Sequence, residues 1–102
     1  MTIDQFFDIL QRRLEISEPS VMDMVTGTKS YQRWMDFLAL KGVFLAAYGD
    51  NAWLLRREHV ARFRALVDSR MPRTGEDDFA LSDRENYFQA LHWIQEHECF
   101  EP

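Results

Sequence analysis

The stretch GVFLAAYGDNAWLL, residues 42–55, decides between two folds for the middle of this chain. Ten of its fourteen side chains are apolar and Asp50 is its only charged residue, in a chain in which 28% of the residues are charged. We expect the first half of the stretch to end a buried helix, with Gly49 as its left-handed stop. Asp50 or Asn51 would then cap the next helix.

A β-hairpin is the alternative for the same stretch. Residues 43–48 and 53–55 have a composition that strands tolerate, and the Gly-Asp-Asn sequence between them forms turns readily. Short apolar runs do not by themselves distinguish a strand from a buried helix. The choice between helix–turn–helix and hairpin for residues 43–56 therefore stays open at this point.

Upstream of this stretch the pattern is helical. Thr2 and Gln5 form a capping box, and apolar residues follow on one helical face, which predicts a helix over residues 3–15. A short helix is expected at residues 20–25, with Pro19 in its first turn and Gly27 closing it. Ser30 is the expected cap of a third helix. The apolar face of the first helix consists of Ile3, Phe6, Phe7, Leu10 and Leu14.

The third helix carries two apolar stripes on different sides. A helix that is apolar on more than one side is usually central in its bundle, so we expect this one to lie at the centre. The first stripe consists of Tyr31, Trp34, Met35, Leu38, Gly42 and Leu45, and the second of Phe37, Leu40, Phe44 and Tyr48.

Downstream, residues 56–71 predict a fourth helix that Pro72 ends. Ser82 and Glu85 give a second capping box, which predicts a last helix over residues 83–99. The fold class expected is all-α, a small orthogonal array or bundle of four to five helices, in a single helical domain over residues 1–102. The inward residues of the fourth helix would be Val60, Phe63, Leu66, Val67 and Met71.

The charges are segregated along the chain. The net charge is −5, yet residues 56–73 hold six arginines against two acids, and residues 74–102 hold eight acids against Arg84. We expect these two segments to neutralise one another within the fold. An acidic chain argues against nucleic-acid binding, which needs a basic surface. The lone cysteine, Cys99, the acidic start and the absence of a run of about 20 apolar residues predict a cytoplasmic protein without a membrane partner.

Few residues are arranged for chemistry. His92, Glu96 and Cys99 fall on one side of the last helix at metal-ligand spacing, but no fourth ligand accompanies them, and we interpret them as ordinary surface residues. The sequence holds no nucleophile turn and no phosphate-binding glycine loop. We therefore expect neither an enzyme nor a bound metal or cofactor.

An interaction protein is the function these observations favour. Small acidic helical proteins of this kind often act as stoichiometric inhibitors or regulators that cover a functional surface of a larger protein, as immunity proteins and anti-activators do. Aromatic anchors would enter an apolar groove of the partner while acidic side chains steer the encounter. The excess of apolar residues also predicts a homodimer. The expected partner-binding residues are Trp93, Phe100, Tyr48, Trp53 and Phe44.

Two of these residues carry the sharpest expectation. On a helix that starts near residue 83, Trp93 and Phe100 point away from the face that packs on the domain, among polar neighbours, so their rings should stand in water as a binding hot spot. A helix–turn–helix DNA-binding regulator is the alternative function, because residues 46–63 combine small residues, a glycine turn and arginines. Trp53 and Leu54 stand where such a motif needs polar side chains.

Overall fold

The computed structural model describes residues 1–48, 54–71 and 78–98, without the side chains of residues 78–80. These residues form five helices and no strand, which confirms the predicted all-α class with four to five helices. The helices are α1 (Ile3–Leu14), α2 (Val21–Thr26), α3 (Lys29–Tyr48), α4 (Arg57–Arg70) and α5 (Asp78–His97).

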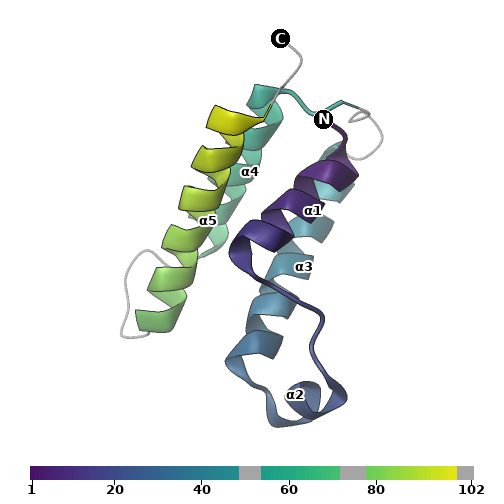
Figure 1. Cartoon of the computed structure of the whole chain (residues 1–102), viewed down its shortest axis with the longest axis vertical. Helices are drawn as coiled ribbons and strands as arrows, with labels where there is room; N and C mark the ends of the chain where they lie inside the picture. The colour runs from purple at the N-terminus through teal and green to yellow at the C-terminus, as the bar shows by residue number, and fades with distance from the viewer. Residues whose placement is uncertain (49–53, 72–77, 99–102) are drawn as a thin grey trace.

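The helices pack pairwise rather than around one central helix (Figure 1). α5 packs against both α4 and α1, and α3 packs against α4. α2 packs against the beginning of α3 and lies at one end of the molecule, beyond the other four helices. The molecule is accordingly elongated, with principal extents of 43 × 29 × 24 Å and a radius of gyration of 14.0 Å, against about 13 Å for an ordinary domain of this length.

The hairpin alternative is excluded, because α3 continues without a break to Tyr48. The next helix begins only at Arg57, so the expectation that Asp50 or Asn51 caps it is wrong. The Arg56 N–H donates to His59 Nδ1 at 3.0 Å, and this contact takes the place of a cap. The expected stop at Gly49 lies outside the described residues.

The first two helices begin and end at local signals. At α1 the Gln5 N–H donates to Thr2 Oγ1 at 3.1 Å and the Thr2 N–H donates back to Gln5 Oε1 at 2.9 Å, so this capping box is confirmed. Ser20 and Asp23 form a second box at α2. Gly27 closes α2 with a φ of 65°, as predicted.

Three predicted helix starts are wrong by a few residues. Pro19 precedes the cap of α2 instead of lying in its first turn. α3 begins one residue before Ser30, since the Tyr31 N–H donates to Thr28 Oγ1 at 3.3 Å. α5 begins at residue 78, so Ser82 lies inside the helix. A serine followed three residues later by an acid also occurs within helices, and tertiary packing decides which reading holds.

The core is rich in phenylalanine. Phe6 and Phe7 of α1 meet Phe44 of α3 and Phe63 of α4, with several edge-to-face contacts at centroid distances of 5.1–5.8 Å. Edge-to-face rings add about 0.5–1.5 kcal/mol each beyond their burial. The core also includes Leu10, Leu14, Ile16, Phe37, Leu40, Leu55, Val60, Val67, Met71, Tyr87, Ala90, Leu91 and Ile94.

α3 is not central, contrary to expectation. Its second stripe is the buried one, with Phe37, Leu40 and Phe44 in the core. The first stripe is only partly covered, and its Met35 and Leu38 are 46% and 39% exposed. Trp34 and Leu45 of this stripe still pack on the edge of the core, so only its middle, Met35, Leu38 and Gly42, is exposed.

Candidate interaction surfaces

The residues expected to bind a partner do not form one surface. Phe44 is 1% exposed and belongs to the core, so it is not available to a partner. Tyr48 is half-buried, with its ring 5.1 Å from that of Phe44 and 5.9 Å from that of His59. Trp53 and Phe100 lie outside the described residues.

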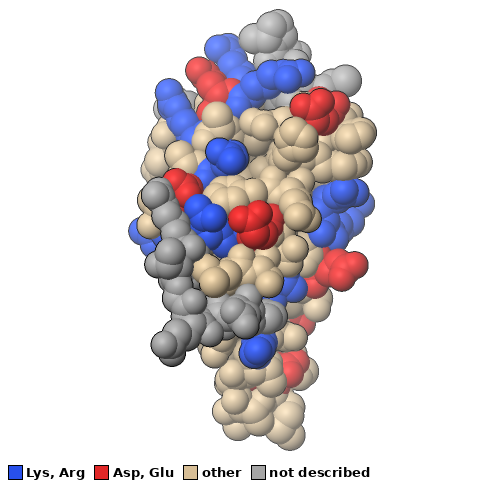
Figure 2. Space-filling view, turned by 90° about the vertical axis from the view of Figure 1, so that its left-hand side faces the viewer, with Lys and Arg blue, Asp and Glu red and all other residues tan. Residues whose placement is uncertain are grey.

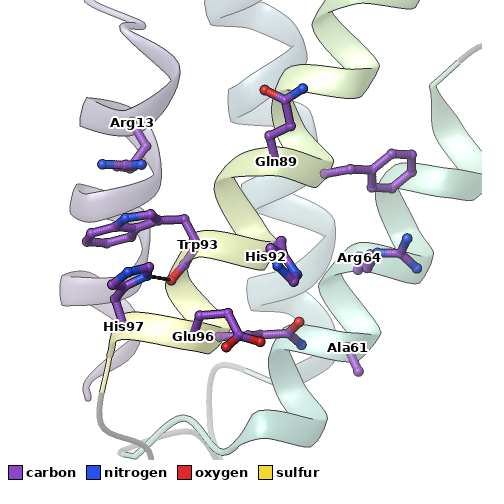
Figure 3. Close-up of a pocket in the computed structure, with 10 residues that line it drawn as sticks. Arg13, Ala61, Arg64, Gln89, His92, Trp93, Glu96 and His97 are labelled. Carbon is purple, nitrogen blue, oxygen red and sulfur yellow. Dashed lines mark hydrogen bonds between the residues drawn. The ribbon is translucent and has the colours of Figure 1, made fainter.

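Trp93 is half-buried, and the expectation that its ring stands in water is wrong (Figure 3). The Arg13 guanidinium lies 3.8 Å from the ring centroid, and the His97 ring stacks on the indole at 4.6 Å. His97 Nδ1 donates to the Trp93 carbonyl at 3.0 Å, because a carbonyl can only accept. Arg13 belongs to α1, and the packing of α1 against α5 brings its guanidinium group over the indole of Trp93.

A shallow groove of about 780 Å³ runs along α5 beside Trp93 and Arg64. His92 and Glu96 lie on its wall and both are exposed (Figure 3). Among the described residues no group of three His, Cys, Asp or Glu side chains is placed to hold a metal ion, and Cys99 lies outside them. The described lining of the groove thus combines cationic and aromatic side chains with the carboxylate of Glu96.

The charged side chains of α4 and α5 lie against aromatic rings. The Arg64 and Arg84 guanidinium groups are 4.7 and 4.5 Å from the centroid of Phe88. Arg84 also pairs with Asp68. This ion pair joins the arginine-rich segment 56–73 to the acidic segment 74–102, but the arginine comes from the acidic segment and the acid from the arginine-rich one, the reverse of what was expected. Positive and negative side chains are mixed on this face (Figure 2).

A buried polar cluster joins α1, α3 and α5. Asp83 is 4% exposed, and its Oδ1 accepts from Arg33 Nε at 2.8 Å. Arg33 Nη2 donates to the Leu14 carbonyl at 2.8 Å. Partial burial, and then the Asp83 carboxylate, raise the pKa of Asp36 at the edge of this cluster, and full burial raises the pKa of the Tyr87 hydroxyl far above its ordinary value. Because Asp83 is enclosed and paired, we interpret the cluster as structural.

Sequence reasoning missed the most exposed apolar surface of the described residues, which lies on α2. Its four apolar side chains, Val21, Met22, Met24 and Val25, are 47–77% exposed, and none of its residues is buried. At about 100° per residue they share an arc of roughly 160°. The lower end of the molecule, where α2 lies, is largely free of charged side chains in Figure 2.

The polar side chains of α2 form hydrogen bonds with residues at the two ends of the helix. Asp23 accepts from Ser20 Oγ at 3.0 Å and from Thr28 Oγ1 at 3.3 Å, so its carboxylate joins the two ends of the helix. Thr26 Oγ1 donates to the Met22 carbonyl at 2.8 Å. The apolar arc of α2 faces solvent, whereas the apolar side of an amphipathic helix usually packs on the core. We call this arc, Val21, Met22, Met24 and Val25, the α2 surface.

Comparison with known proteins identifies no relative: no family model, curated protein or solved structure matches the chain. Within the described ranges, no helix is both long enough and apolar enough to cross a bilayer.

Proposed function

We propose that this protein is a protein-interaction module that binds a larger protein through the α2 surface and acts as a stoichiometric inhibitor or regulator of it. The single observation that supports the proposal is the exposure of the apolar arc of α2, which faces solvent and packs on no core residue. An isolated helix of six residues has little stability in water, and contiguous exposed apolar surface usually marks a site of association.

The shape and chemistry of α2 indicate the kind of site that receives it. α2 protrudes from the end of the molecule, so it fits a concave apolar groove better than a flat surface (Figure 1). Met22 and Met24 have unbranched side chains that adapt to an irregular groove. The net charge of −5 favours encounter with a basic partner.

The test uses three forms of the purified chain as baits and compares the proteins that each one retains from an extract of the source cell. The double variant Val21→Ser/Val25→Ser removes apolar surface from α2, and Leu54→Ser makes a matched change near the other end of the molecule, at a side chain 48% exposed. We expect wild type and Leu54→Ser to retain one saturable partner at a 1:1 ratio and the double variant to lose it. Capture of the same proteins by the double variant contradicts the proposal.

The regulatory part of the proposal has its own measurement. Once the partner is purified, calorimetric titration gives its stoichiometry, and its activity is followed as the chain is added. We expect activity to change in proportion to the chain bound and to stop changing at one equivalent. If the partner binds the chain and its own activity does not change, an inhibitory role for the chain is excluded and a role in assembly remains.

A further inference from the structure

α3 contains a glycine that the packing of the described residues does not require. Gly42 lies in the interior of the helix and is exposed, and a Cβ added to it would meet nothing within 4 Å. Glycine in a helix interior costs about 0.5–1 kcal/mol relative to alanine. The described part of the chain therefore gains nothing from Gly42, which points to a close approach by something outside it.

The residues around Gly42 form a continuous uncharged face. Between residues 35 and 46, six positions of α3 fall within an arc of about 120°, on the side of the helix opposite its buried phenylalanines. Five are exposed and Leu45 is half-buried. Lys41, which borders the arc, turns toward α1, with its Nζ 5.4 Å from the Phe7 ring centroid. We call the six residues the outer face of α3: Met35, Leu38, Ala39, Gly42, Leu45 and Ala46.

The spacing within this face indicates a helical partner. Met35, Leu38, Gly42 and Leu45 are separated by three, four and three residues, which is the seam of a two-helix packing at a shallow crossing angle. Ala39 and Ala46 flank the seam with small side chains that permit a close approach. A surface that receives another helix is expected from this pattern.

The same spacing identifies the partner helix as a second copy. The sequence of intervals reads the same in both directions, so two antiparallel copies of α3 match about a two-fold axis near residue 40. Met35 then lies opposite Leu45 of the second copy, and Leu38 opposite Gly42 of the second copy. A large side chain thus meets the space that the glycine leaves, and the contact is self-complementary, as two-fold interfaces require.

We propose that the outer face of α3 is a homodimer interface in which two copies of α3 pack antiparallel. The face is about 17 Å long at 1.5 Å per residue, shorter than a standard interface of roughly 800 Å² per partner needs, so the dimer is reversible. We expect a dissociation constant in the micromolar range. This proposal does not depend on the α2 surface, since the two share no residue.

The first test separates association from stability. Gly42→Gln places a larger, helix-favouring side chain where the single chain has space, so the dilute monomer should melt at a higher temperature while the dimer is lost. Ala47→Gln is the matched control, because Ala47 is exposed on the same helix outside the outer face. It should leave the dissociation constant of wild type unchanged within about twofold.

Light scattering coupled to size exclusion measures both variants and wild type over the micromolar range. We expect wild type to approach twice the 12.2 kDa of one chain as concentration rises, and Gly42→Gln to remain at 12.2 kDa. Wild type that stays at 12.2 kDa throughout overturns the proposal, and so does a Gly42→Gln variant that dimerises as strongly as wild type.

The second test determines the register. In a Cys99→Ser background, Ala39→Cys places two thiols beside the two-fold axis, and Met35→Cys places them ten residues apart, about 15 Å along the helices. A disulfide needs Cα atoms roughly 4.4–6.8 Å apart. We expect mild oxidation to cross-link the Ala39→Cys dimer alone. Cross-linking of both variants, of Met35→Cys alone or of neither overturns the antiparallel register.

Discussion

Arg33 holds three helices together with one guanidinium group. It lies on α3, pairs with Asp83 of α5 and donates to the carbonyl of Leu14 at the end of α1. Replacing a paired buried charge by an uncharged residue leaves its partner without compensation, which costs more than the net value of the pair itself. The cost of losing Arg33 is therefore set by Asp83, which is almost fully enclosed.

We expect Arg33→Ala to lower the free energy of unfolding by about 3–5 kcal/mol at neutral pH. Arg12→Ala is the control, because Arg12 and Asp8 form an exposed pair on one helix and such pairs contribute at most about 1 kcal/mol. Urea unfolding followed by circular dichroism measures both. Similar losses in the two variants would contradict the structural role of the cluster.

Asp36 makes stability depend on pH in a defined direction. Its pKa in the folded chain is raised above the ordinary 3.8 by burial and by Asp83, so the folded state binds its proton more tightly than the unfolded state. The unfavourable contribution of ionised Asp36 is therefore fully present above the folded pKa and is relieved as pH falls toward the unfolded value.

Asp36→Asn should thus stabilise the protein at neutral pH, by an amount that shrinks as pH falls through the range above 3.8. Urea unfolding of both proteins over a series of pH values gives the difference directly. Glu58→Gln, a change of the same kind on α4, away from Asp83, serves as control. A difference that does not vary with pH would exclude Asp36 as its source.

At the scale of the helix, α1 and α2 use the same cap chemistry with different consequences. Thr2 and Ser20 both accept a backbone N–H from the residue three positions on, but α1 supplies core residues and α2 supplies none. Loss of a cap costs a helix about 1 kcal/mol. That loss reaches global stability only where the helix belongs to the cooperative core.

We therefore expect Thr2→Ala to lower the global free energy of unfolding by about 1 kcal/mol and Ser20→Ala to leave it unchanged within a few tenths. Amide hydrogen exchange should instead accelerate in Ser20→Ala over residues 21–27 alone. If Ser20→Ala destabilises the whole protein as much as Thr2→Ala, α2 is part of the core unit.

The helices that could be predicted from sequence are those with strong local signals. α1 and α2 follow from their caps, and the inward residues of α4 from their spacing. The burial of Asp83 within α5 could not be predicted, because its partner Arg33 lies 50 positions away in the sequence. Local pattern cannot detect such a contact.

The candidate surfaces were harder to predict for a related reason. Periodicity locates an apolar side of a helix, but the inference that it faces inward assumes a neighbour to cover it. That assumption holds for Phe37 and Phe44 and fails for Met35, Leu38 and the α2 surface. Trp93 shows the converse error, since its polar neighbours along α5 concealed the packing of α1 and its Arg13.

At the scale of the molecule, the distribution of charge leads to a prediction about the alternative function, a DNA-binding regulator. The net charge is −5, and Arg62 and Arg64 of α4 lie over the rings of Tyr48 and Phe88. We expect the chain to pass through a heparin column at low salt without retention, because binding to polyanions needs an accessible basic surface. Retention that salt reverses and that Arg57→Ala weakens would restore the alternative.

The packing of α1 against α5 has a consequence for biosynthesis. Phe6 and Phe7 are synthesised more than 70 residues before α5, which packs over α1. At about 5–20 residues per second the nascent chain displays these rings for several seconds before their enclosure is complete. A chaperone that recognises exposed phenylalanine would therefore find its substrate in the unfinished chain, and pauses in translation before residue 78 would prolong that exposure.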